Sequence, residues 1–410
     1  MNIFIPKKSA ILTGRSTFYA ISLGILVALS WRVAPAQQPA TVQQILSGTM
    51  LPSDEVTTFE HSEALYPSRR VWRKGSVRPL PLAANQLKTV RFKWNGKDYD
   101  LFDYLADNRI AGLLILKDGK VMFEDYELGT TSATRWASFS MAKSISSTLV
   151  AAALHQRLIS SLDDPISHYV SALKGGGYDG VSIRNLLQMA SGVRWNETYT
   201  DPQSDVSKLG LLLLAQKTGT VVTYMSGLPK AGAPGSIWNY STGETYLIGA
   251  VIEGATHKPL ATYLSETLWS PLGMEHDATW WSESPDGMGL AGSGVSATLR
   301  DYGRLGLFVQ QDGVIDRQRI VPEGWFREAG SAHFIGGKSV DYGYLWWPMP
   351  AGEDPIHQGA FEARGIFGQH IYINPNEKLV IVVLSARPKP TGSTVINDAA
   401  FFAAVARYLK

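Results

Sequence analysis

The chain has 410 residues, of which 45% are hydrophobic and 18% charged, and it contains 12 Trp and no Cys. This composition is typical of a folded globular protein and excludes intrinsic disorder and a coiled coil. The absence of cysteine excludes a disulfide scaffold, a thiol nucleophile, thiolate-bound zinc and iron–sulfur clusters. The formal net charge of +2 gives no reason to expect nucleic acid as a partner.

The first 36 residues have the pattern of an export signal. Basic residues and no acidic ones precede an apolar run over residues 18–31, and Ala34-Pro35-Ala36 fits a small-x-small cleavage site. The run is shorter than the roughly 20 residues that a spanning helix needs. We therefore expect residues 1–36 to be a cleaved signal peptide of a periplasmic or secreted protein, in preference to an uncleaved anchor, and no membrane span in the mature chain.

Two regions follow the predicted signal. Residues 37–95 are interrupted by prolines and show no sustained period, so we interpret them as an N-terminal extension that packs on or leads into the main domain, 96–410. The main domain opens with two apolar runs, 110–116 and 121–126, around Asp118-Gly119, which predicts a β-hairpin. A helix is expected next, over residues 140–157.

The rest of the chain alternates between helical and extended patterns. We expect mainly helix and loop to about residue 330, with helical pieces at 183–189 and 302–310. The C-terminal part predicts strands at 342–347, 368–373 and 379–384 and a closing helix over 395–409. Strands at both ends around a helical middle predict an α+β fold, in which helices flank one antiparallel sheet and a helical region is inserted.

A Ser-x-x-Lys pair is the strongest candidate for chemistry. Ser140 and Lys143 fall in the first turn of the predicted helix, where residues three apart share a face. A desolvated lysine can act as the base that a serine nucleophile needs, and the helix N-terminus favours the alkoxide. The alternative is a capping serine followed by a solvated lysine. A second match, Ser171 to Lys174, runs into three glycines and is attributed to chance.

Other hydrolase signatures are absent from the sequence. It contains no Gly-x-Ser-x-Gly elbow, which argues against an α/β-hydrolase. It contains no His-Glu-x-x-His, and its eight histidines are scattered. We therefore expect neither a metal site nor an organic cofactor.

Several passages together resemble the serine β-lactamase/penicillin-recognising superfamily, in its class C-like branch with esterases and 6-aminohexanoate-dimer hydrolase. The resemblance spans roughly residues 100–408. It is carried by the Ser-x-x-Lys segment, by a counterpart of the Tyr-x-Asn motif that contains Tyr240, and by further family-like stretches, namely residues 138–144, 181–192, 238–242, 246–249, 271–274 and 294–302.

The resemblance implies that Ser140 is the acylated nucleophile and that Lys143 and Tyr240 transfer protons. A lysine ammonium next to a tyrosine would make the phenolate accessible, so that Tyr240 could take the serine proton and pass it to the leaving group. The alternative interpretation of Tyr240 is a buried aromatic residue with a satisfied hydroxyl.

The sequence departs from the family pattern at two motifs. Thr242 stands where the second motif has Asn, and the third motif, Lys-Thr-Gly in β-lactamases, has no literal match. Two registers compete for it, His357-Gln358-Gly359 and Ala363-Arg364-Gly365. We prefer the second, because Gly365 allows close approach of the acyl group and the Ile366 N–H could complete an oxyanion hole with the Ser140 N–H. Loss of the motif's lysine argues against β-lactam hydrolysis as the primary function.

Tyr199 is the remaining candidate. It lies in a polar and aromatic loop, residues 195–202, and in the aminohexanoate-dimer branch a tyrosine in a similar loop assists the leaving nitrogen. An exposed loop aromatic is the alternative. Together with Thr242 and Gly365, Tyr199 is predicted to bind substrate.

These observations predict an exported serine hydrolase that cleaves a small ester or amide through an acyl-enzyme on Ser140. Two alternatives stay open at this point: a β-lactamase or penicillin-binding activity, and a non-catalytic cell-envelope binding protein that retains the fold. The sequence does not determine the oligomeric state, and it does not choose between ester and amide.

Overall fold

The computed structural model describes residues 40–350, 352 and 354–410, which belong to one compact unit, Gln37–Lys410. The predicted signal peptide, residues 1–36, lies outside the described residues. The α-helices are α1 Val42–Ser47, α2 Pro52–Glu60, α3 Leu101–Asp107, α4 Met141–His155, α5 Ile183–Leu187, α6 Asp205–Leu212, α7 Thr220–Ser226, α8 Thr242–Thr256, α9 Leu260–Leu264, α10 Leu299–Gln310, α11 Trp325–Ala329 and α12 Asp398–Tyr408.

Short helical turns and strands complete the chain. The turns are η1 Ser62–Ala64, η2 Ile166–His168, η3 Ser171–Leu173, η4 Leu213–Ala215, η5 Ser265–Trp269 and η6 Pro355–His357. The strands are β1 Ser68–Val71, β2 Arg91–Trp94, β3 Lys97–Asp100, β4 Ile110–Lys117, β5 Lys120–Tyr126, β6 Arg135–Ala137, β7 Ala278–Trp281, β8 Val295–Thr298, β9 Val314–Ile315, β10 Gln318–Arg319, β11 His333–Ile335, β12 Lys338–Val340, β13 Trp347–Pro348, β14 Phe361–Gly365, β15 Gln369–Asn374 and β16 Leu379–Ser385.

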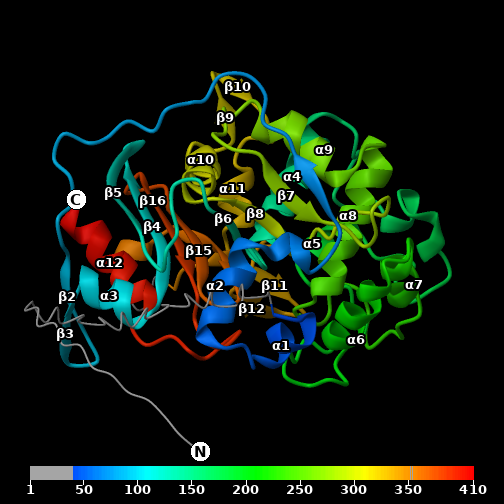
Figure 1. Cartoon of the computed structure of the whole chain (residues 1–410). Helices are drawn as coiled ribbons and strands as arrows, with labels where there is room; N and C mark the ends of the chain where they lie inside the picture. The colour runs from blue at the N-terminus through cyan, green and yellow to red at the C-terminus, as the bar shows by residue number, and fades with distance from the viewer. Residues whose placement is uncertain (1–39, 351, 353) are drawn as a thin grey trace, which may run out of the picture. The chain divides into compact units, whose positions relative to one another are not determined.

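The main sheet joins the two ends of the described chain. Its order is β13-β14-β15-β16-β4-β5 and its neighbours are antiparallel, so β16 pairs with β4 from the start of the main domain. Helices α3 and α12 lie on one side of this sheet and α10 on the other (Figure 1). Alternate residues of β16 face these two sides: Ile381 and Val383 join the core cluster that includes α3 and α12, whereas Val380 and Val382 join the cluster that includes α10. The predicted antiparallel sheet with flanking helices is therefore confirmed.

A second sheet, β1-β7-β8-β6, takes its two middle strands from the part expected to be mainly helix and loop. That expectation was wrong for β7 and β8. Each has only four residues, too short for a two-residue alternation to be recognised among the surrounding Gly, Ser and Trp. The sheet leads into the helix that carries the Ser-x-x-Lys pair, because β6 ends at Ala137 and the Ser138 N–H donates to the Val295 carbonyl at 2.7 Å.

The strand predicted at 342–347 is another correction, since only Trp347 of that range is extended. The preceding residues turn instead. Leu345 has a φ of +61°, and the Tyr344 N–H donates to the Ala329 carbonyl. A Cβ on Gly343 would lie 1.8 Å from that same carbonyl oxygen, so the glycine is needed for the close approach.

The closing helix starts later than expected, at Asp398 instead of residue 395. The Asn108 side chain accepts hydrogen bonds from the backbone of Val395 and Ile396, which holds these two residues outside the helix. Asn397 then caps α12 by accepting from the Ala400 N–H.

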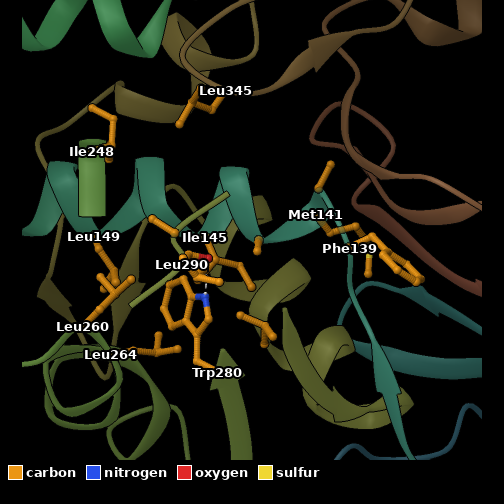
Figure 2. Close-up of a cluster of buried hydrophobic side chains, with 14 of the residues drawn as sticks. Phe139, Met141, Ile145, Leu149, Ile248, Leu260, Leu264, Trp280, Leu290 and Leu345 are labelled. Atoms are coloured by element: carbon orange, nitrogen blue, oxygen red, sulfur yellow. Dashed lines mark hydrogen bonds between the residues drawn. The ribbon is translucent and has the colours of Figure 1, made fainter. Parts of the chain in front are cut away.

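Helix α4 is anchored by a buried apolar cluster below the Ser-x-x-Lys pair. Ile145 and Leu149 point from α4 towards Trp280 and Leu290, and the indole of Trp280 donates to the Leu290 carbonyl at 3.1 Å (Figure 2). Close packing against this cluster therefore fixes the position of α4. Among the described helices, none is long and apolar enough to cross a bilayer.

Residues 40–95 pack against the rest of the described chain. Strand β1 pairs with β7, α1 contacts α6, and α2 contacts β6. The following loop returns along the main sheet, where the Val121 N–H donates to the Pro81 carbonyl.

Candidate active site

Ser140 stands at the junction of β6 and α4. It is the N-cap residue of α4, but its side chain gives the described helix no capping hydrogen bond, so the capping interpretation of this serine does not hold. The preceding residue, Phe139, has a φ of +44°, which is unusual for a bulky residue and is common at functional turns. Phe139 is held by aromatic packing against Phe59 and Phe367, with ring centroids 4.9 Å and 5.3 Å away.

Lys143 lies one turn along α4 and is buried, so the alternative of a solvated lysine does not hold either. Its Nζ lies 3.0 Å from the Ser140 Oγ, 3.0 Å from the Thr242 Oγ1 and 2.8 Å from the Gly292 carbonyl oxygen. Burial lowers the pKa of Lys143 to about 8, although the Glu197 carboxylate acts in the opposite direction. A neutral amine next to the Ser140 hydroxyl is therefore accessible near neutral pH.

Glu197 fixes the hydroxyl of Thr242. The Thr242 Oγ1 donates to one carboxylate oxygen at 2.5 Å, and the Thr242 N–H donates to the other at 3.0 Å. The Trp195 indole and the Tyr199 hydroxyl donate to the same carboxylate, at 2.5 Å and 3.0 Å. Thr242 thus contacts the lysine of the Ser-x-x-Lys pair and also lines the cavity next to Ser140, and its substrate contact stays a prediction.

The Tyr240 ring lies above Lys143, with its centroid 5.1 Å from Nζ. It stacks on Trp347 at a centroid distance of 5.7 Å. Burial raises the pKa of Tyr240 well above its usual range, and Glu197 raises it further, whereas the hydrogen bond with Ser140 acts in the opposite direction. This direction is contrary to the expected accessible phenolate, since burial outweighs any benefit from the nearby lysine. Tyr240 is therefore a neutral phenol near neutral pH.

Gly365 and Ile366 lie at the end of β14, next to the turn that carries Ser140. A Cβ on Gly365 would lie 2.4 Å from the Ser138 carbonyl oxygen, so only glycine fits there without displacement. Within the described part of the chain, neither the Ser140 N–H nor the Ile366 N–H donates to an acceptor. The two amides are thus available to an oxygen atom placed between them.

The two competing registers of the third motif lie in different places. Ile366 and Ser140 line one cavity, whereas His357 is buried elsewhere, where its ring contacts the Tyr372 hydroxyl at 3.0 Å and the Ala399 carbonyl at 3.1 Å. The geometry supports our preference for the register at Ala363-Arg364-Gly365.

The cavity beside Ser140 has a volume of about 80 Å³. Its walls are mostly aliphatic and aromatic, and its polar groups are the hydroxyls of Ser140, Thr242 and Ser293 and of three tyrosines, including Tyr199. Tyr199 is a partly buried wall residue, so the exposed-loop alternative does not describe it. No group of three or more His, Asp or Glu residues suited to a metal occurs among the described residues.

Sequence reasoning missed two contributors, Glu197 and Gly292. A lone glutamate in a polar loop and a carbonyl on a glycine carry no motif of their own. The available signal for Glu197 was its position two residues before Tyr199, in a loop already singled out for chemistry.

Comparison with known proteins adds to this geometry. The sequence model of the beta-lactamase family matches residues 101–405, most of the chain. The chain belongs to the beta-lactamase family. A 6-aminohexanoate-dimer hydrolase from Paenarthrobacter ureafaciens is 28% identical over 306 residues, which cover 71% of this chain and 76% of the relative. This beta-lactamase-family protein is accordingly a serine hydrolase, as the resemblance of its motifs predicted.

Solved structures support the fold. A Bacillus anthracis protein, provisionally assigned as a 6-aminohexanoate-dimer hydrolase, superposes with a TM-score of 0.77 at 22% identity, covering 91% of this chain and 98% of the other. A penicillin-binding protein homologue from Caulobacter crescentus superposes with a TM-score of 0.56 at 15% identity, covering 75% and 94%. At these identities the likeness establishes the beta-lactamase fold.

Proposed function

We propose that this beta-lactamase-family protein hydrolyses a small ester or amide through an acyl-enzyme on Ser140. The observation that carries the proposal is the 3.0 Å contact between the Ser140 Oγ and the buried Lys143 Nζ, whose pKa is lowered to about 8. A serine hydroxyl becomes an effective nucleophile when a base at this distance takes its proton.

The hydrogen bonds of Lys143 determine where its lone pair points. The Gly292 carbonyl can only accept, and the single proton of Thr242 Oγ1 is already donated to Glu197, so Thr242 must also accept from Lys143. These two acceptors use both N–H groups of a neutral amine. The remaining lone pair then faces the Ser140 hydroxyl, which makes Lys143 the base of the proposed reaction and Glu197 a positioning residue.

The proposed reaction has two halves. In the first, the Ser140 Oγ bonds to the substrate carbonyl carbon while its proton moves to Lys143, and the oxyanion accepts from the Ser140 and Ile366 N–H groups. Collapse breaks the C–O or C–N bond, and the leaving group takes a proton from Tyr240, which Lys143 then reprotonates. In the second, a water oxygen bonds to the acyl carbon while its proton moves to Lys143. Collapse breaks the bond from this carbon to the Ser140 Oγ, the proton passes from Lys143 to Oγ, and the carboxylic acid leaves.

The structure also bears on the β-lactam alternative. Arg364 is the cation nearest to the lysine position of the third motif, but its guanidinium pairs with Glu362 and lies 5.3 Å over the Trp347 ring. A paired guanidinium is a weaker site for a substrate carboxylate than a free lysine. This observation, and the relative named as a 6-aminohexanoate-dimer hydrolase, favour a simple ester or amide.

Export is a second part of the proposal. It rests on the sequence pattern of residues 1–36, the basic start, the apolar run and the Ala34-Pro35-Ala36 site. N-terminal sequencing of the full-length protein from a bacterial host checks it. The expected mature N-terminus is residue 37, and recovery of the intact N-terminus in the cytoplasm would contradict export.

The reaction is tested by a screen of p-nitrophenyl esters and short amides with the Ser140→Ala and Ser171→Ala variants. Ser171 belongs to the second Ser-x-x-Lys match and is exposed on η3, so it provides a matched control. We expect Ser140→Ala to lose turnover and labelling by a fluorophosphonate probe, while Ser171→Ala retains both. Hydrolysis that survives Ser140→Ala would exclude the mechanism, and fast nitrocefin turnover by the wild type would restore the β-lactamase alternative.

A further inference from the structure

Part of the cavity wall comes from outside the region that matches the family. Val42, Ile45 and Leu46 of α1 line the cavity together with Leu65 and Tyr66, whereas the family match begins at residue 101. The rest of the lining comes from residues within the match, including Ser140 and Ile366. The N-terminal segment and Ser140 therefore line the same cavity.

This wall is built as a defined structure. Thr41 caps α1 in a reciprocal capping box with Gln44, and Val42 and Ile45 are buried. The Tyr66 hydroxyl donates to the Gly210 carbonyl of α6 at 3.0 Å. A Cβ on Gly210 would lie 3.3 Å from the Leu46 Cδ1, so α6 and α1 approach each other closely at the cavity.

The cavity offers no countercharge. Among the described residues no charged side chain lines it. The nearby carboxylate of Glu197 already accepts four hydrogen bonds from Thr242, Trp195 and Tyr199. An ammonium or carboxylate group that entered this space would lose hydration without gaining a partner of opposite charge, which is unfavourable. The volume of about 80 Å³ is roughly half that of an apolar cavity that holds benzene, which favours a short group.

We propose that residues 40–66 make this hydrolase selective for esters or amides with a short, apolar and uncharged acyl group. The inference rests on the proposed acyl-enzyme reaction and adds the substrate class. A 6-aminohexanoate dimer, the substrate in the relative's name, carries charged ends at neutral pH and falls outside this class.

The test introduces a charge into the wall and, separately, just outside it. Leu46→Asp places a carboxylate at the cavity, while Gln43→Asp places one on the exposed side of the same helix. The probes are the p-nitrophenyl esters of butanoic acid and 3-aminopropanoic acid, which differ only in a methyl or an ammonium at the end of the acyl chain. The ratio of their kcat/KM values is compared between variants, so that the intrinsic reactivity of each ester cancels.

We expect the wild type to favour the butanoyl ester and Leu46→Asp to shift the ratio towards the ammonium ester by about 10- to 100-fold, with Gln43→Asp unchanged. Leu46→Asn should weaken butanoyl hydrolysis without favouring the ammonium, and fluorophosphonate labelling reports whether each variant is folded. An equal ratio in Leu46→Asp, Gln43→Asp and the wild type would overturn the proposed role of this wall in acyl selectivity. If the wild type hydrolyses neither ester in a way that depends on Ser140, the proposed acyl-enzyme reaction is refuted instead.

Discussion

The surroundings of Lys143 fix the position of its amine. Its three contacts come from its own helix, from the start of α8 and from the Gly292 carbonyl, and it is buried among them. A solvated lysine would stay charged at neutral pH, but this one has a pKa lowered to about 8 by burial. In the proposed reaction this amine can therefore take the Ser140 proton near neutral pH.

The acid limb of the pH profile tests this role. Because the base must be neutral, kcat/KM for an uncharged ester should rise roughly tenfold per pH unit below pH 8 and level off above it. The measurement is a pH series of initial rates. A profile that is flat between pH 6 and pH 9 would show that Lys143 is not the base.

Glu197→Gln should separate positioning from simple structural support. The amide can donate to Thr242 Oγ1, so the threonine hydroxyl becomes free to donate to Lys143 and to occupy its lone pair. We expect kcat to fall about 10- to 100-fold with little change in KM. Since Glu197 raises the pKa of Lys143, its neutralisation should also move the acid limb to lower pH.

Glu244→Gln is the matched control for that experiment. Burial raises the pKa of Glu244 to about 8, so its carboxyl is already neutral at pH 7, and its buried partner is Ser191 rather than Lys143. This variant should retain the wild-type kcat, and the acid limb of its pH profile should stay at the same pH. If Glu197→Gln lowers kcat but does not move the acid limb of the pH profile, the role assigned to Glu197 is wrong.

At the scale of elements, sequence patterns predicted the long strands well. Seven consecutive residues of β4 and six of β16 are non-polar and buried, and a turn with Asp118-Gly119 separates β4 from β5. Strands β7 and β8 were missed because four residues hold too little periodicity. The turn at Gly343–Leu345 was missed because close contacts with Ala329 and Leu187, distant in sequence, determine it.

The residues of the candidate site likewise divide into those that motifs predict and those that only the folded structure identifies. Ser140, Lys143 and Tyr240 stand in motifs, and the structure brings them together as the resemblance implied. Glu197 and Gly292 act through atoms that many residues possess, a carboxylate and a carbonyl, so only the folded arrangement identifies them. The apolar wall formed by α1 was equally hidden, because six residues of mixed composition give no indication of what they face.

Gly210→Ala tests the contact between α6 and α1. The added methyl would approach Leu46 and the Tyr66 hydroxyl at 3.3 Å and 3.5 Å, and so would narrow the cavity. Alanine also favours the helical conformation by about 0.5–1 kcal/mol over glycine. We therefore expect the melting temperature to be unchanged or higher, while kcat/KM for a hexanoyl ester falls about tenfold relative to an acetyl ester. Equal effects on both esters would contradict a role in acyl selection.

On the scale of the whole molecule, a buried charge cluster ties α12 to the main sheet. The His370 ring lies between Glu362, at 2.7 Å, and Asp398, at 3.4 Å. Asp398 also accepts from Arg387 at 2.5 Å and from the Tyr104 hydroxyl at 2.7 Å. Burial alone would lower the pKa of His370, but the two carboxylates outweigh it and raise this pKa, so the ring is held in its charged form.

This cluster predicts a pH-dependent contribution to stability. Because the folded-state pKa of His370 is raised, its contribution is fully present below the unfolded value of about 6.5 and is lost as the pH rises through the folded value. His370→Gln should therefore lower the free energy of unfolding by about 3 kcal/mol at pH 6 and by clearly less at pH 10. Denaturant titrations at both pH values measure this, with the exposed His168→Gln as control. An equal loss at both values would show that His370 contributes through packing alone.

The packing of Phe59, Phe139 and Phe367 determines when the candidate site can form during synthesis of the chain. These rings meet beside Ser140, yet they are contributed by α2, by the turn before α4 and by the hairpin between β14 and β15. During synthesis Ser140 and Lys143 emerge more than two hundred residues before Phe367. A nascent chain therefore carries the proposed nucleophile and base long before the turn around them can close, and we expect hydrolytic competence only when the last strands have been made.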